Sequence, residues 1–211
     1  HYTGREAHAS AFPEAGVNAA DALTVAQVGI GLLRQQFRSQ DKVHGIVTKG
    51  GDAPNVIHAH TSAKYYVRAA TLEALETLEA NVRRCFEAGA LATGTEVAFD
   101  QLSPRYSEFV PHTGMQALYR RNAEALGRTF PEAPDHVMLA ATDMANVSLA
   151  VPSIHPMLDI DSLPAMNHEP EFAAAAITPT ADRAVGEGAL AMAWTIVDLA
   201  TDDSLRAELA G

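Results

Sequence analysis

The sequence has one cysteine among its 211 residues, Cys85. A single cysteine excludes an internal disulfide framework and a cysteine-based zinc site, and it is typical of a protein from a reducing compartment. Cys85 lies in the helical pattern VRRCF, at positions 82–86. We therefore expect a small buried side chain at this position rather than a nucleophile.

Long apolar runs and an excess of basic charge are also missing. No run approaches the roughly 20 apolar residues that span a bilayer, and the first residues lack the layout of a signal peptide. Lys and Arg total 15 and Asp and Glu total 26, so the formal net charge is −11. Nucleic acids and anionic membranes both attract clusters of basic residues. We therefore predict a cytoplasmic protein that binds neither nucleic acid nor membrane.

The first 103 residues predict the order strand, helix, strand, strand, helix, strand. Apolar residues at helical spacing follow Asn18 and Thr71, which are both residue types that cap helices. The helices are expected over 18–37 and 71–88, and the strands over 2–7, 42–48, 55–69 and 95–99. Two helices on one face of a four-stranded antiparallel sheet form the ferredoxin-like arrangement, which serves many functions.

Residues 104–211 have a different pattern, in which prolines punctuate a polar stretch. Helices are expected over 115–127 and 180–200, and the short apolar runs at 137–140, 147–151 and 157–160 are expected to be buried strands. Together these elements predict an α/β segment. A few strands with helices on one side cannot cover both faces of a parallel sheet. We therefore expect this segment to need a partner.

His8 stands in the sequence GREAHAS at positions 4–10, followed by Pro13 and by Gly-Val-Asn at 16–18. An ordinary hydrogen-bonded histidine at a strand end is one interpretation. The pattern as a whole resembles the lid signature of the M20 metallopeptidases and amidohydrolases. The resemblance implies that His8 is catalytic: it would reach into the active site of the dimer partner and stabilise the oxyanion, as a donor does where negative charge develops.

Asn55 belongs to a second motif, GGDAPNVI, at positions 50–57. Asparagine is common at such turns, so a structural role is one alternative. The motif also resembles a lid stretch of the same family, which implies that Asn55 binds substrate. Relatives often have proline where this chain has His58. Arg68, further along the same predicted strand, is another candidate contact.

His168 lies in NHEPEF, at positions 167–172, ahead of the last long helix. A histidine beside two carboxylates is often only a surface residue in an ion-paired loop. The resemblance instead implies that His168 is the final metal ligand, and neutral imidazole binds zinc well. It further implies that the complete enzyme holds two divalent metal ions, and we expect these to be zinc.

Residues 141–156 resemble the aminobenzoyl-glutamate hydrolase-like branch of the family. In this stretch Asp143 and His155 are expected to shape the pocket wall rather than to bind metal. Relatives tend to have Ser and Gly where this chain has Ala141 and Ala145. Because alanine disfavours positive φ, we expect this loop to be rebuilt.

The resemblance implies a ferredoxin-like lid and dimerisation domain over 1–103 and the C-terminal part of an α/β zinc-peptidase-type catalytic domain over 104–211. It also implies a homodimer that hydrolyses an amide bond in an N-acyl amino acid, aminobenzoyl-glutamate-like or dipeptide substrate. The family's His-x-Asp motif and Glu-Glu pair do not occur here, so we expect the chain to lack the N-terminal catalytic portion and to be inactive alone. The alternative is a non-catalytic ferredoxin-like module that dimerises or binds a small molecule.

Overall fold

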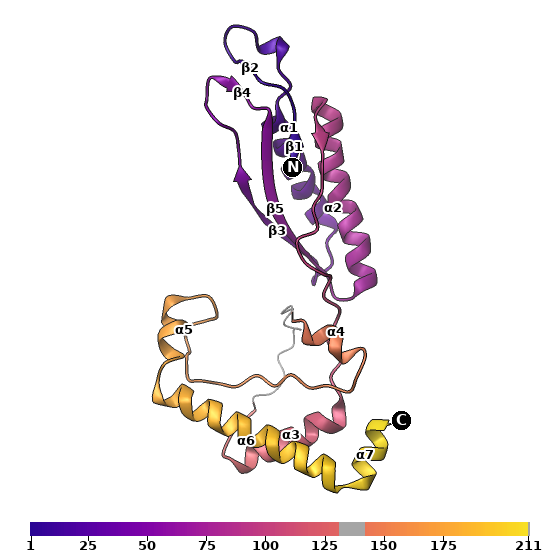
Figure 1. Cartoon of the computed structure of the whole chain (residues 1–211), viewed down its shortest axis with the longest axis vertical. Coiled ribbons are helices and arrows are strands. Elements are labelled where there is room, and N and C mark those ends of the chain that lie inside the picture. Colours follow the sequence, from indigo (N-terminus) through magenta and orange to yellow (C-terminus); the bar gives the residue numbers. More distant parts are fainter. Residues whose placement is uncertain (131–141, 211) are drawn as a thin grey trace. The chain divides into compact units, whose positions relative to one another are not determined.

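The structure is a computed structural model that describes residues 1–130 and 142–210, without the side chains of 208–210. It contains two units, His1–Glu108 and Phe109–Gly211 (Figure 1). Among the described residues, no helix has both the length and the apolar character needed to cross a membrane. The division of function between residues 1–103 and 104–211 stays a prediction.

The first unit has the expected ferredoxin-like fold. Its four-stranded antiparallel sheet has the order β3-β5-β1-β6. The strands are β1 (Tyr2–Thr3), β3 (Lys42–Lys49), β5 (His60–Arg68) and β6 (Glu96–Val97), and the helices are α1 (Ala19–Leu33) and α2 (Leu72–Thr93). The helices pack on each other and on the sheet. The mixed α/β fold class is therefore confirmed, with a βαββαβ ferredoxin-like fold in this unit.

Capping residues set the start of both helices and the C-terminal end of α2. The Asn18 side chain accepts from the backbone N–H of Ala20 at 3.0 Å and begins α1. The Thr71 hydroxyl does the same for Ala74 at 3.2 Å and begins α2. Helix α2 ends at Gly94, whose φ of 72° lies in the left-handed region that glycine adopts without strain.

Two expected strands of this unit are each divided. The segment 2–7 forms β1 and then β2 (Ala7–His8), while 55–69 forms β4 (Val56–Ile57) and then β5. The second division has a visible cause at residues 58–59. The carbonyl of His58 accepts from the N–H of Ala19 at 2.8 Å, and that of Ala59 accepts from Gly4 at 2.7 Å. These carbonyls therefore bond to the first residue of α1 and to the residue after β1.

The core of the first unit lies between the helices and the sheet. Tyr2 is 2% exposed, and its hydroxyl donates to the Phe86 carbonyl of α2 at 2.6 Å. Burial raises the pKa of Tyr2. Cys85 lies in the same helix, partly buried beside Gly29 of α1, and burial raises the pKa of its thiol. A thiol of raised pKa is a poor nucleophile, which agrees with the packing role expected for Cys85.

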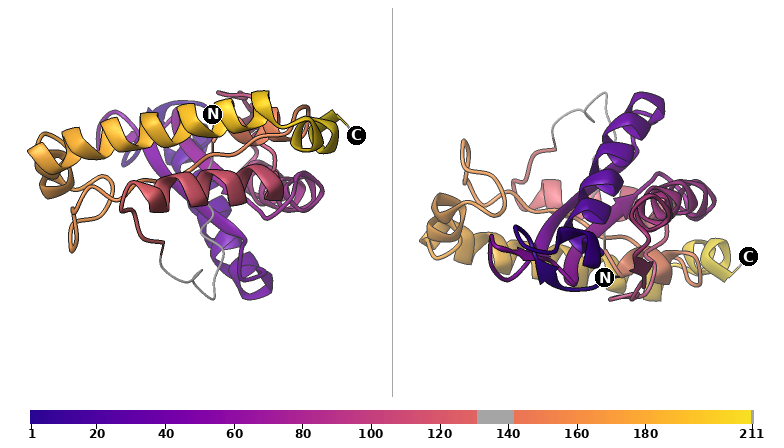
Figure 2. Two further views of the ribbon diagram at one scale, coloured as in Figure 1. Left: turned by 90° about the horizontal axis from the view of Figure 1, so that it is seen from below. Right: turned by 90° about the horizontal axis from the view of Figure 1, so that it is seen from above.

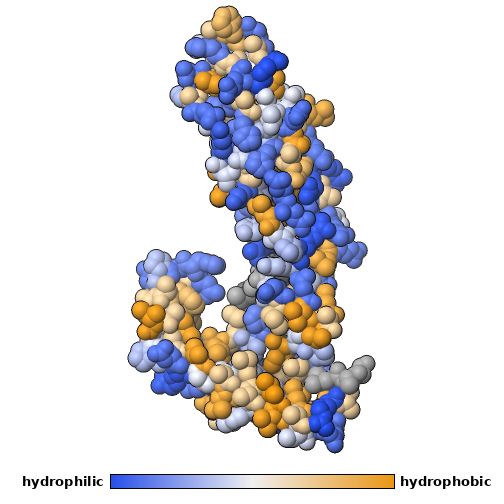
Figure 3. Space-filling view, viewed as in Figure 1, coloured by the Kyte–Doolittle hydropathy of each residue, from blue (hydrophilic) through white to orange (hydrophobic). Residues whose placement is uncertain are grey.

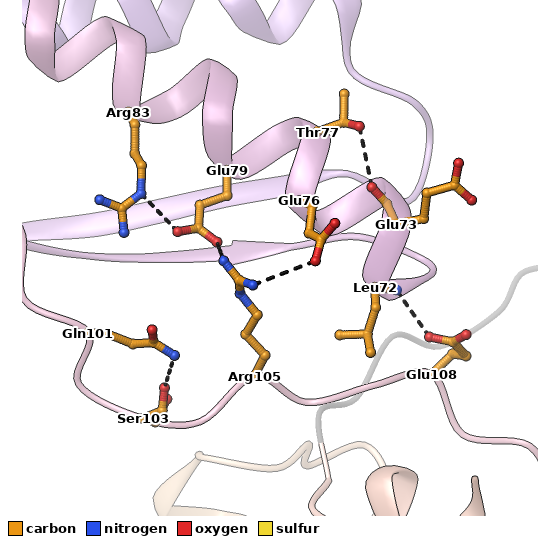
Figure 4. Close-up of polar contacts among 10 residues, drawn as sticks. All are labelled: Leu72, Glu73, Glu76, Thr77, Glu79, Arg83, Gln101, Ser103, Arg105 and Glu108. Carbon is orange, nitrogen blue, oxygen red and sulfur yellow. Dashed lines mark hydrogen bonds and ion pairs between the residues drawn. The ribbon is translucent and has the colours of Figure 1, made fainter.

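Ion pairs hold the segment that follows β6 against helix α2 (Figure 4). Arg105 contacts Glu79 at 2.8 Å and Glu76 at 3.7 Å, and Glu79 also accepts from Arg83 at 2.9 Å. Partial burial acts to raise the pKa of Glu79, but the hydrogen bonds from Arg83 and Arg105 outweigh it, so that the pKa is lowered. At the end of this segment, Glu108 accepts from the first N–H of α2.

The second unit is helical in its described part. Its helices are α3 (Thr113–Ala125), α4 (Met144–Ser148), α5 (Pro170–Ala175), α6 (Pro179–Thr201) and α7 (Asp203–Ala210). Helices α3 and α6 run side by side, as Figure 2 shows, and bury Tyr119, Ala123 and Ala191 between them. Asn122 of α3 donates to Asp198 of α6 at 2.8 Å.

The surface of the second unit carries many apolar side chains, which Figure 3 shows in orange. On α6, Val185 is 68% exposed and Ile196 is 66% exposed. Exposed apolar residues gathered along one helix are typical of a surface that packs against further protein. This surface agrees with the expectation that the segment needs a partner.

The expected strands of the second unit are not found where the structure describes the chain. The strand over 147–151 is wrong, because Val147 lies in α4 and its carbonyl accepts from Ala150 and Val151 in a turn. The prediction of a strand over 157–160 is also wrong. These residues form no strand, and Leu158 packs against Gly188 of α6. Short apolar runs do not distinguish strand from helix or loop by periodicity alone. The run at 137–140 lies outside the described residues.

Candidate functional site

His8 ends the short strand β2 near one end of the first unit (Figure 1). Strand β2 pairs antiparallel with β4, with His8 opposite Val56. The His8 side chain is exposed. Its Nδ1 accepts from the backbone N–H groups of Ser10 at 3.2 Å and Ala11 at 3.1 Å. The imidazole is therefore held by its own loop.

The structure brings Asn55 beside His8. The Asn55 carbonyl accepts from the N–H of Ala9 at 3.0 Å, and the Asn55 side chain is exposed. The two sequence motifs, 47 positions apart, thus meet through one backbone hydrogen bond and the β2–β4 pairing. We call the exposed residues His8 and Asn55, together with the turn from Ala9 to Ala11, the lid tip.

Two glycines of the first motif allow the chain to fold back under the lid tip. A Cβ on Gly4 would lie 2.0 Å from the carbonyl oxygen of Val17, and a Cβ on Gly16 would lie 2.6 Å from the Ile57 side chain. Arg5 and Val17 also exchange two backbone hydrogen bonds of 2.9 Å. The motif residues around His8 are therefore needed for local packing as well as for the side chain that they carry.

The second motif has a comparable requirement at Gly51. Its φ of 142° is a conformation that side chains rarely adopt, and a Cβ there would lie 2.3 Å from Nδ1 of His58. In the next position, Asp52 forms a 2.9 Å ion pair with Lys49. The hydrogen bond from Lys49 lowers the pKa of Asp52, and the nearby His58 and His60 lower it further.

His168 belongs to the second unit, in the loop before α5. Its side chain is exposed and its φ is 79°. Glu169 does not bond to it in the described structure but accepts from the N–H of Met166 at 2.9 Å. Across residues 1–130 and 142–210, no group of three or more His, Cys, Asp or Glu residues could hold a metal ion. These residues therefore do not form a metal centre among themselves, and the ligand role of His168 stays a prediction.

The stretch that includes Asp143 and His155 is also placed in the second unit. Asp143 precedes α4, and its carbonyl accepts from Asn146 at 3.1 Å. Nδ1 of His155 lies 3.4 Å from the Thr142 hydroxyl, and its ring lies 6.2 Å from that of Phe109. Both residues help to shape this loop. Their expected place in a pocket wall stays a prediction.

The amides of Ser10 and Ala11 are the feature of the lid tip that sequence reasoning missed. Backbone donors carry no side-chain signal, and small residues after a histidine are too common to indicate a turn of this kind. The only sequence signal for these hydrogen bonds is the run of small residues from Ala9 to Ala11, because small side chains let the loop fold back on the imidazole.

Known proteins resemble both units. Residues 1–93 match the family model M20_dimer, a peptidase dimerisation domain. Over 200 residues the chain is 36% identical to the Xaa-Arg dipeptidase of Mus musculus, in a match that covers 94% of this chain and 46% of that protein. Over 108 residues it is 32% identical to one of the subunits of the p-aminobenzoyl-glutamate hydrolase of Escherichia coli strain K12, and this match covers 50% of the chain and 22% of the relative.

A solved structure supports the same fold. The hydantoinase/carbamoylase family amidase of Burkholderia ambifaria matches with a TM-score of 0.54 at 22% identity, over 72% of this chain and 37% of that one. The chain spans about half the length of the Xaa-Arg dipeptidases that it matches. Residues 1–93 therefore belong to the dimerisation domains of the M20 peptidases, and the chain is similar to the Xaa-Arg dipeptidases over both units.

Proposed function

We propose that the chain supplies the lid and the C-terminal portion of a metal-dependent amidohydrolase. Its substrate class would be N-acyl amino acids, aminobenzoyl-glutamate-like compounds or dipeptides. The names of two relatives, a dipeptidase and an aminobenzoyl-glutamate hydrolase, support this class. The observation that carries the proposal is the lid tip, where His8 at the end of β2 and Asn55 just before β4 are neighbours and are both exposed.

The proposed chemistry follows from the groups at the lid tip. When water attacks an amide, negative charge develops on the carbonyl oxygen. An imidazole N–H of His8 placed at that oxygen stabilises the transition state more than the ground state. Asn55 offers both a donor and an acceptor, which suits an amide or a carboxylate of the substrate. His8 would act in the site of the partner subunit.

A metal centre is proposed only for the complete enzyme. Two divalent ions, zinc by preference, would be held there with His168 as one ligand. The described residues of this chain offer no cluster of ligands, and a tight site needs three or more protein ligands. The 211 residues are therefore expected to be inactive alone.

A homodimer through the first unit is supported by its surface. Strand β3 is an edge strand of the sheet, and Ile46 on it is 65% exposed. On α1, Val25, Val28 and Leu32 recur at helical spacing and are all exposed. An unpaired strand edge beside an apolar stripe is a surface that a second copy can cover. Because the unit matches a dimerisation domain, we propose that a second copy of the chain covers this surface.

The experiment uses the reading frame that encodes this chain, extended upstream to its start codon. Purified protein is assayed on N-acyl amino acids, aminobenzoyl-glutamate and dipeptides with added zinc. His8→Ala should lower kcat with little change in KM, because it removes a transition-state interaction, whereas Asn55→Ala should raise KM. His168→Ala should lower the bound metal content. Full activity in the His8 variant would contradict the proposal.

Mixed dimers test the role of His8 across subunits. A His8→Ala chain keeps its metal ligands, and a His168→Ala chain keeps its lid histidine. Random exchange makes half of the dimers mixed, and each mixed dimer holds one complete site, so about a quarter of wild-type activity should return. No recovery would place His8 in the site of its own subunit. Hydrolysis by the 211-residue chain alone would contradict its expected inactivity.

The alternative is a non-catalytic dimerisation or small-molecule-binding module. The family model covers residues 1–93 alone, which favours a module built on the first unit. The relation to the dipeptidases nevertheless extends through both units. A start codon directly before His1 would support the module, and an in-frame His-x-Asp and Glu-Glu segment upstream would support the enzyme.

A further inference from the structure

The geometry points to a further property of the lid tip: the backbone amides of Ser10 and Ala11 select, for the neutral His8 ring, the tautomer whose proton is on Nε2. This inference rests on the proposed function, because it names the donor that His8 would offer. It makes Ser10 and Ala11 positioning residues, which act through His8.

The tautomer follows from the two hydrogen bonds. Nδ1 of His8 accepts from the N–H of Ser10 at 3.2 Å and from that of Ala11 at 3.1 Å. A ring nitrogen that accepts through its lone pair does not carry a proton, so the proton of the neutral ring is on Nε2. Two donors share this one acceptor, and the Nδ1–H tautomer would lose both bonds.

The surrounding backbone holds this turn in place. The N–H of Phe12 donates to the His8 carbonyl at 3.0 Å and closes the loop. The N–H of Ala9 donates to the Asn55 carbonyl, also at 3.0 Å. The loop that orients the imidazole is therefore bonded to Asn55, the residue before β4. A change in the turn would move His8 relative to Asn55.

The other ring nitrogen is left available. No residue that the structure describes pairs with Nε2 of His8, and the side chain is exposed. Nε2–H is thus a donor whose direction is set before substrate arrives. A donor oriented in advance stabilises developing negative charge without reorganisation. Protonation of Nδ1 would convert the acceptor into a donor and release both amides.

The first test reads the tautomer by ¹⁵N NMR of the His8 ring in the 211-residue chain. The wild type should show an unprotonated Nδ1 and a protonated Nε2. Ser10→Pro and Ala11→Pro each remove one donor from an exposed position. Each should shift the ring nitrogens toward the mixture of tautomers that free imidazole shows. Ring signals that do not change in either variant would overturn the inference.

The second test is independent of proline and uses hydrogen exchange at the amides of Ser10 and Ala11. In His8→Asn, the Asn Oδ1 can accept from amides two residues on, as in an Asx turn, so protection should be kept. His8→Gln extends its amide toward the position of Nε2 and places no acceptor at Nδ1, so exchange should become several-fold faster. Equal exchange in the wild type and His8→Gln would overturn the inference. Unchanged amides in the β3–β5 ladder would show that the fold is intact.

The two proposals fail in distinguishable ways. If the ring is held as Nε2–H but His8→Ala keeps full activity in the extended enzyme, the proposed function fails and the tautomer assignment stands. If the ¹⁵N signals of the His8 ring are the same in the wild type and both proline variants while His8→Ala loses activity, the tautomer assignment fails and the proposed function stands.

Discussion

Gly89 of α2 lies directly against the backbone carbonyl of Ala22 of α1. A Cβ on Gly89 would lie 2.3 Å from the Ala22 oxygen and 2.8 Å from the Tyr2 hydroxyl. Both Gly89 and Ala22 are buried. The two helices of the first unit can therefore approach at this level only because position 89 has no side chain.

Replacing Gly89 should separate the helices and destabilise the first unit. Gly89→Ala is expected to lower the free energy of unfolding by about 1–3 kcal/mol, because the obstacle is backbone that cannot rotate away. Gly31 of α1 is the matched control, since a Cβ there meets nothing within 4 Å. Gly31→Ala should raise stability by about 0.5–1 kcal/mol through the helix preference of alanine. Denaturant unfolding measures both, and equal effects would contradict the packing argument.

Removing the Tyr2 hydroxyl should weaken the attachment of β1 to α2. Tyr2→Phe loses the 2.6 Å hydrogen bond to the Phe86 carbonyl, and we expect a loss of about 1 kcal/mol in the free energy of unfolding. Tyr66→Phe is the control, because that ring is exposed, and its effect should stay within about 0.5 kcal/mol. If Tyr2→Phe left the free energy of unfolding unchanged, the hydrogen bond of the Tyr2 hydroxyl would contribute no stability.

Acid should weaken the first unit partly through Glu79. The pKa of Glu79 is lowered in the folded chain, so its ionised form adds stability above its unfolded pKa of about 4.3, and this stability is lost as the pH falls through the folded pKa. The wild type should therefore lose more stability between about pH 5 and pH 3 than Glu79→Gln. Glu87→Gln, an exposed carboxylate change in the same helix, is the control for the loss of one negative charge. Parallel curves for the wild type and Glu79→Gln would contradict the ion-pair role.

Asn122 should tie α3 to α6 in the second unit. Its amide donates to Asp198 at 2.8 Å and to Thr195 at 3.2 Å from a buried position. The hydrogen bond to Asp198, with that from Arg121, lowers the pKa of Asp198. Asn122→Ala should cost about 1–2 kcal/mol and raise the Asp198 pKa toward its ordinary value. Carbon NMR of the Asp198 carboxyl measures the pKa; no shift would contradict the contact. Gln116→Ala, on an exposed site of α3, is the control.

The exposed stripe of α1 should decide the oligomeric state. Leu32 is 63% exposed, and Leu32→Lys should convert the proposed dimer into a monomer, because a charge would be buried against the second copy. Leu91→Lys on α2 is the control, since Leu91 is 88% exposed and lies outside the proposed surface. Light scattering over a range of concentrations measures the mass. A wild-type monomer at every concentration would count against the dimer.

Sequence reasoning predicted the first unit well because its signals are local. Asn18 and Thr71 act as caps, and Gly94 ends α2 in the left-handed conformation. The second unit was harder, since the apolar run at 147–151 has no periodicity that separates a strand from a short helix and turn. Whether such a run forms a strand depends on a neighbouring strand, which lies elsewhere in the sequence.

The same limit applies at the lid tip. The sequence by itself singled out His8 and Asn55 for the proposed chemistry, because the local motifs around them resemble those of the family. Only the tertiary structure decided that these residues are neighbours and that the amides of Ser10 and Ala11 hold the His8 ring. The reason is physical: strand pairing and backbone hydrogen bonds use N–H and C=O groups that almost every residue has, so their partners are chosen by the fold rather than by residue type.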